Sequence, residues 1–180
     1  VDAFQSRVAD WVASATHPET GLPYDQMTYQ PMVELLRYLR DEGFKTYIVS
    51  GGGIHFMRVF AEAAYGIPSE QVIGTYTETE YKVENGVPVI VKSPALGFVD
   101  DKEGKPVNIE RIIGKRPILV GGNSDGDFAM LEWATAGDGP RSRSLSAIVV
   151  ASFASPSMTG IIGCSPGFRS KPRAVIWARK

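Results

Sequence analysis

Apolar residues recur every three or four positions in several stretches of the chain, which is the spacing of a helix with one buried face. The pattern predicts helices over 2–15, 29–42, a stretch that follows Gly53, 107–113 and 127–134. Pro31 suits the first turn of the second helix, and Gly43 suits its C-terminal cap. We therefore expect amphipathic helices separated by short connections.

Short apolar or alternating runs between these helices predict strands. The runs lie at 46–49, 72–83, 87–92, 118–120 and 146–151. Asn85-Gly86 separates the second run from the third and favours a tight hairpin turn. Alternation of strands with helices is typical of an α/β fold with a mostly parallel sheet, and such sheets bind ligands at the carboxyl ends of their strands.

The composition agrees with a folded domain of this class. Of 180 residues, 43% are hydrophobic and 22% charged, which excludes a mostly disordered or collagen-like chain. Cys164 is the only cysteine, which excludes a disulfide framework and a cysteine-cluster zinc site, and two histidines leave little for a histidine-based metal site. No apolar run is long enough to span a membrane, and the net charge of −1 gives no reason to expect nucleic acid as a partner.

Acidic residues are confined to the first part of the chain. All 20 lie at or before Asp138, whereas residues 139–180 carry seven basic side chains and are rich in Ser, Pro and Gly. Two interpretations of 141–180 stay open: a basic, loosely structured tail, or a tail that is not the native continuation of the domain, as a frameshift near 141–143 would produce. The chain also opens at Val1, directly before a predicted helix, so we expect an incomplete chain.

Ser50-Gly51-Gly52-Gly53 follows the first predicted strand and precedes a predicted helix. Glycines let the backbone approach an anion closely, and the serine adds a hydroxyl donor, so a phosphoryl oxygen would fit there. The alternative is a tight connection between strand and helix with no ligand.

Gly122-Asn123-Ser124-Asp125-Gly126-Asp127 follows the buried run at 118–120. Its carboxylate and amide oxygens suit Mg²⁺, and a solvated loop is the alternative. The segment also matches G-x-S-x-G, the elbow of a serine hydrolase with Ser124 as nucleophile. That fold needs a histidine after the serine, and His17 and His55 both precede it, so this interpretation is the less favoured one.

Lys105 follows Gly104 shortly before the helix predicted at 107–113. That helix leads into the strand at 118–120, so the lysine could reach the same sheet edge and neutralise phosphate charge. Taken alone, a solvated surface lysine is the alternative.

In combination these motifs resemble the haloacid dehalogenase-like (HAD) hydrolase superfamily, and within it the phosphoserine-phosphatase-like branch. The resemblance covers about 29–138 and is most specific at 48–53 and 122–127. It implies a Rossmann-like core, with a mostly parallel sheet, flanking helices and a β-hairpin, and a helical cap inserted before Ser50. Residues 1–28 would be the end of that cap, 29–140 an incomplete core and 141–180 the atypical tail.

The resemblance also implies a chemistry: Mg²⁺-dependent hydrolysis of a small phosphomonoester through an aspartyl-phosphate. Ser50 and Lys105 would be the catalytic groups, and Gly51 and Gly52 would bind the phosphoryl group with them. Asn123 and Asp127 would hold Mg²⁺.

One part of the family pattern is not found in these 180 residues. The first motif, Asp-x-Asp-x-Thr after an apolar strand, supplies the nucleophile, and the only Asp-x-Asp here is Asp125-Gly126-Asp127 of the later motif. We therefore expect the chain as given to be inactive, with an apolar slot where the middle strand of the sheet would lie. The alternative function is a non-catalytic fragment or pseudoenzyme that keeps a phosphate- or Mg²⁺-binding pocket.

Overall fold

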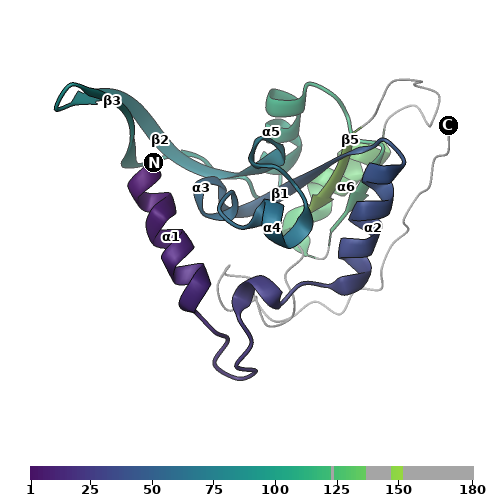
Figure 1. Cartoon of the computed structure of the whole chain (residues 1–180). Helices are drawn as coiled ribbons and strands as arrows, with labels where there is room; N and C mark the ends of the chain where they lie inside the picture. Colours follow the sequence, from purple (N-terminus) through teal and green to yellow (C-terminus); the bar gives the residue numbers. More distant parts are fainter. Residues whose placement is uncertain (123, 137–146, 152–180) are drawn as a thin grey trace.

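The computed structural model describes residues 1–122, 124–136 and 147–151, and in these the chain alternates helices with strands as predicted (Figure 1). The elements in chain order are α1 (Asp2–Ser14), η1 (Tyr24–Gln26), α2 (Gln30–Asp41), β1 (Lys45–Gly53), α3 (Ile54–Met57), α4 (Ala61–Tyr65), η2 (Ser69–Gln71), β2 (Val72–Glu84), β3 (Val87–Phe98), α5 (Gly104–Ile113), β4 (Leu119–Gly121), η3 (Asp125–Asp127), α6 (Phe128–Thr135) and β5 (Ala147–Ala151).

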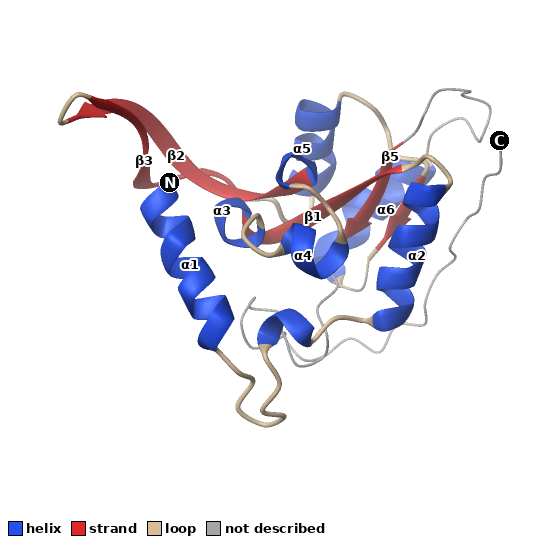
Figure 2. Ribbon diagram, viewed as in Figure 1, coloured by secondary structure: helices blue, strands red, loops and turns tan. Residues whose placement is uncertain are grey.

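The strands form one sheet in the order β3-β2-β1-β5-β4. Strand β1 pairs in parallel with β2 and β5, β4 pairs in parallel with β5, and only the β2–β3 hairpin is antiparallel. The hairpin projects from the body of the molecule (Figure 2). Its turn residues Asn85 and Gly86 both have positive φ, as a type I′ turn requires. The predicted α/β class, a mostly parallel Rossmann-like sheet with flanking helices, is confirmed.

Two buried apolar clusters lie on opposite faces of the sheet. Val49 and Ile73 pack on one face against Ile109 of α5 and Met130 of α6. Their chain neighbours Ile48 and Val72 belong to the other cluster, because successive strand residues point to opposite faces. That second cluster draws on α2, α3 and α4 and contains Leu36, Leu39, Ile54, Met57, Ala61, Tyr65, Ile67 and Val72.

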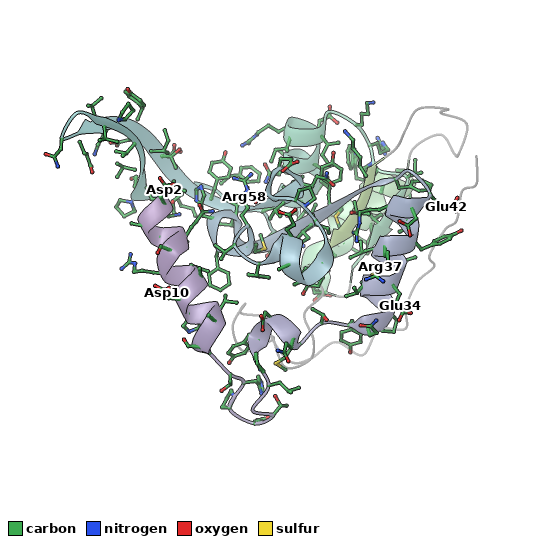
Figure 3. The ribbon with its side chains drawn as sticks, viewed as in Figure 1. Asp2, Asp10, Glu34, Arg37, Glu42 and Arg58 are labelled. Atoms are coloured by element: carbon green, nitrogen blue, oxygen red, sulfur yellow. The ribbon has the colours of Figure 1, made fainter. Side chains whose placement is uncertain are left out.

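Charged side chains lie on the outward faces of the first two long helices. Asp2 and Asp10 on α1 and Glu34 and Arg37 on α2 are exposed (Figure 3). The face of α2 that carries Leu36 and Leu39 meets the sheet. This arrangement follows the predicted amphipathic pattern. No helix in the described part of the chain is long and apolar enough to cross a membrane.

Strand β5 occupies the slot that we expected to be empty. It lies between β1 and β4, with Ala151 in register with Val49 and Val150 in register with Gly121. The strand comes from the segment expected to be an atypical tail, yet its backbone completes the sheet of the core. The rest of 141–180 lies outside the described residues.

Two local features differ from the sequence prediction. The helix expected after Gly53 is divided into α3 and α4, because Val59 and Phe60 end the first segment with short-range turn bonds to Phe56 and Met57. Helix α5 begins at Gly104 and not at 107. Pro106 is tolerated in its first turn, because proline lacks a backbone N–H and the N–H groups of the first turn have no partner within the helix. The earlier start places Lys105 inside the helix.

Candidate functional site

Ser50 lies near the carboxyl end of β1, where a bulge interrupts the pairing with β2. Its side chain is buried, and its Oγ accepts a hydrogen bond from the Gly52 N–H at 3.2 Å. The paired residue Gly74 has no room for a side chain, because a Cβ there would lie 2.7 Å from the Gly52 carbonyl oxygen. The predicted glycine turn is therefore the bulged end of a strand, and Gly74 on the neighbouring strand permits the close packing.

Lys105 is buried beneath this strand end, with 2% of its surface exposed. Its Nζ donates to the Val49 carbonyl oxygen at 3.3 Å and pairs with Asp127 Oδ1 at 2.5 Å. A buried ammonium is stable only with such partners. The position contradicts the alternative of a solvated surface lysine and brings Lys105 next to the backbone that carries Ser50.

Asp127 is fully buried and also fixes the turn before α6. Its Oδ2 accepts hydrogen bonds from the N–H and the Oγ of Ser124, each at 3.1 Å, as a capping box. Ser124 thus serves as a cap of this helical turn. The histidines that a serine hydrolase would need have other neighbours: His17 packs on Tyr24, and His55 bonds Lys92.

Asp100 and Asn108 belong to the same buried group and were missed by the sequence reasoning. Both are fully buried, and Asn108 Nδ2 donates to Asp100 Oδ1 at 3.2 Å. The backbone of Ser50 also hydrogen-bonds the Asp100 carboxyl. Burial raises the pKa of Asp100 to about 6, although Asn108, Lys105 and the Ser50 bond act to lower it. One signal was available: Asn108 follows Lys105 by three residues and so shares its helix face.

The loop that carries Asp100 is joined to the turn that carries Asp127. The Lys102 N–H donates to the Gly126 carbonyl oxygen at 3.1 Å, and a side chain at Gly126 would collide with Asp101. Three segments distant in sequence therefore meet at one sheet edge. Of the predicted site residues, Ser50, Lys105 and Asp127 are brought together there, with Gly51 and Gly52 adjacent in the chain.

The described residues do not by themselves fit a Mg²⁺ site. They contain no group of three His, Cys, Asp or Glu side chains that could hold a metal ion. Both carboxylate oxygens of Asp127 are already hydrogen-bonded, and the other predicted ligand, Asn123, lies outside the described residues. What the edge offers is a buried cation, a hydroxyl and flexible backbone amides, which are groups that bind an oxyanion.

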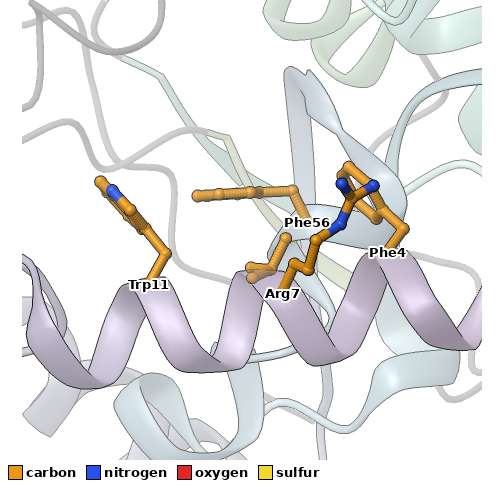
Figure 4. Close-up of a pocket in the computed structure, with 5 residues that line it drawn as sticks. Phe4, Arg7, Trp11 and Phe56 are labelled. Atoms are coloured by element: carbon orange, nitrogen blue, oxygen red, sulfur yellow. The ribbon is translucent and has the colours of Figure 1, made fainter.

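A separate pocket of ≈ 320 Å³ lies along α1 (Figure 4). Its lining is largely apolar: Phe4, Val8, Trp11 and Phe56, with Arg7 at its side. Trp11 also stacks on Tyr24 at 5.3 Å. Helix α1 lies in the segment that we expected to be the end of a cap, and its contacts with α3 place it beside the core.

A comparison with models of protein families shows which family the chain matches. The family model of haloacid dehalogenase-like hydrolases matches residues 2–132. A solved structure of a conserved, functionally unknown protein from Anaerococcus prevotii DSM 20548 is 28% identical, with a TM-score of 0.48. The match covers 74% of this chain and 34% of that protein, so the chain spans about a third of its length. No curated protein matches the chain significantly.

Proposed function

The chain belongs to the haloacid dehalogenase-like hydrolases, as its motifs predicted, and we propose that its sheet edge binds the phosphoryl group of a small phosphomonoester. The observation that carries this proposal is the burial of Lys105, whose Nζ donates to the carbonyl oxygen of Val49, the residue before Ser50. An ammonium in a low-dielectric surrounding attracts an anion far more strongly than a solvated one. The Ser50 hydroxyl is close enough in sequence and fold to donate to the same group.

Each residue has a part in this proposal. Ser50 donates its O–H to a phosphoryl oxygen, and Gly51 and Gly52 let the backbone approach closely. Lys105 has three N–H donors, of which Val49 and Asp127 use two, and its charge offsets that of the bound dianion. Asp127 holds Lys105 in place and keeps its ammonium oriented.

Hydrolysis of the bound phosphomonoester would also need Mg²⁺. In the reaction that the family resemblance implies, a bound Mg²⁺ would supply positive charge to offset that of the phosphoryl group. Asn123 and Asp127 would contribute to that site only together with further ligands.

For the 180 residues given, binding without turnover is the function that we favour. Strand β5 holds the place between β1 and β4, and its residues Ala147–Ala151 include no carboxylate. The strand that carries the nucleophile in the resembling family would need this place. Strand β5 therefore supplies no carboxylate that could accept the phosphoryl group, whereas the groups that bind the oxyanion remain.

Calorimetric titration of the chain with sulfate, a stable stand-in for a phosphoryl dianion, tests the binding proposal. Ser50→Ala should weaken sulfate binding on the order of tenfold, as expected for loss of one hydrogen bond to a charged group. Ser6→Ala, at an exposed position of α1, is the matched control and should leave affinity unchanged. Equal affinity in both variants, or no binding by the parent chain, would contradict the proposal.

Hydrolysis of p-nitrophenyl phosphate with Mg²⁺ tests the absence of turnover. We expect no release of phosphate above that of the Ser50→Ala variant. Turnover that the substitution abolishes would show that the chain carries a nucleophile of its own.

A further inference from the structure

Asp100 and Asn108 form a buried pair that the proposed function does not use. Both side chains are fully shielded from solvent, and Asn108 Nδ2 donates to Asp100 Oδ1 at 3.2 Å. The remaining oxygens, Asp100 Oδ2 and Asn108 Oδ1, have no hydrogen-bond partner among the described residues. Each is an acceptor that has lost its bonds to water.

One proton would satisfy both of these oxygens. A neutral carboxyl donates its O–H to the amide oxygen while the amide N–H donates to the other carboxyl oxygen. An ionised carboxylate has acceptors only and leaves both oxygens without a donor. Because a buried acceptor without a donor destabilises the folded state, the pair favours the neutral form of Asp100.

The groups that face Asp100 come from several elements. On β1, the Ser50 backbone hydrogen-bonds its carboxyl, and on α5 Lys105 supplies a positive charge. On β2, Thr75 Oγ1 accepts the backbone N–H of Asp100 at 3.0 Å. The next residue, Asp101, adds a negative charge. Burial outweighs the attraction of Lys105 and raises the pKa of Asp100 to about 6, which agrees with the unsatisfied oxygens.

We propose that Asp100 is a positioning residue of the oxyanion site: its neutral carboxyl, paired with Asn108, holds the backbone at Ser50, and loss of its proton weakens oxyanion binding. This inference rests on the proposed function. A charge on Asp100 would compete with the oxyanion for the field of Lys105 and would repel the oxyanion directly. Asp100 acts through Ser50 and Lys105 and does not itself touch the ligand.

Titration of the full chain with sulfate at two pH values tests the inference, since sulfate stays doubly charged throughout. Affinity of the parent chain should fall on the order of tenfold between about pH 5 and about pH 7.5, as an added nearby charge implies. The Asp100→Asn variant, whose side chain cannot ionise, should bind sulfate with the same affinity at both pH values. His55→Gln is the control, because His55 is a titratable group that bonds Lys92 away from Ser50, and this variant should keep the fall.

The outcomes separate the two proposals. Equal affinity of the parent chain at both pH values, or an undiminished fall in Asp100→Asn, would overturn the role of Asp100 and leave the oxyanion site standing. Absence of sulfate binding at both pH values would overturn the proposed function and the inference with it.

A second readout does not depend on the variant or on sulfate. The carboxyl carbon-13 resonance of Asp100 should titrate with a midpoint of about 6 in the folded chain. A midpoint at or below about 4, the ordinary value for an aspartate, would overturn the neutral pair.

Discussion

Two regions of the molecule depart from the usual pattern of buried apolar and exposed polar side chains. One is the carboxyl end of the sheet, and the other is the side formed by α1 and the β2–β3 hairpin. At the sheet edge, Lys105 and Asp127 are buried and bonded to each other. On the hairpin, apolar side chains face solvent, Tyr81 with 67% of its surface exposed. Buried ionised groups are rare and need partners, whereas exposed apolar residues are common. The sheet edge is therefore the more informative region about function.

Removal of the buried cation should have the largest effect. Lys105→Met removes the ammonium that pairs with the buried Asp127 carboxyl group, which should cost about 3–5 kcal/mol of unfolding free energy. Urea unfolding measures the loss. Lys102→Met, at an exposed position three residues earlier, is the control and should change stability by less than about 0.5 kcal/mol. Similar losses of unfolding free energy in both variants would contradict the special role of the buried ammonium.

The pH dependence of the unfolding free energy should reveal the protonation of the Asp100 carboxyl group. Its pKa is raised to about 6 in the folded chain, so the folded state binds more protons than the unfolded state between about pH 4 and pH 6. The contribution of Asp100 to the free energy of unfolding is fully present below its pKa in the unfolded chain. It is lost as the pH rises through its pKa in the folded chain, and the total loss is about 3 kcal/mol. Asp100→Asn should remove this decline. An unchanged slope in urea unfolding across that window would show that the carboxyl titrates normally.

Close packing at the end of β1 should be measurable at Gly74. An alanine Cβ there would lie 2.5 Å from Met57 Cε and 2.7 Å from the Gly52 carbonyl oxygen. The carbonyl oxygen belongs to the backbone of β1, so it cannot move aside as a side chain could. Gly74→Ala should cost about 1–3 kcal/mol. Gly121→Ala is a matched control on β4, where nothing lies within 4 Å of the added Cβ. Thermal unfolding of the two variants compares them, and a larger loss at Gly121 would contradict the packing described here.

The smallest effect is expected on the hairpin. Tyr81 lies across from Ile90, and both are exposed on the same face of the ribbon. Tyr81→Ser should change the unfolding free energy by no more than about 0.5 kcal/mol, because its ring is not packed in a core. A loss above about 2 kcal/mol in urea unfolding would show that this face is covered in solution.

The proximity of the main candidate residues could be predicted because it follows from the topology of the sheet. Ser50 and Asp127 each follow an apolar strand, and parallel strands end at one edge, so their proximity needed only the strand assignments. Lys105 was expected at the same edge because it shortly precedes the helix predicted at 107–113.

Other features depend on tertiary contacts that local pattern does not contain. Asp100 lies in a loop, and its importance comes from burial against Ser50 and Asn108, which are distant from it in sequence. The apolar run at 146–151 predicted a strand but not its place in the sheet, since hydrophobicity does not specify which strands will be its neighbours. The β-bulge at Ser50 likewise results from pairing with Gly74.

Backbone amide shifts on addition of sulfate test the central claim most directly, because they locate binding in the folded chain. We predict the largest nitrogen–proton shifts at Ser50, Gly51 and Gly52, where the edge offers a hydroxyl and a buried ammonium. Shifts confined to α1 around Arg7 and Trp11, or no shifts, would contradict the assignment of the sheet edge as the oxyanion site.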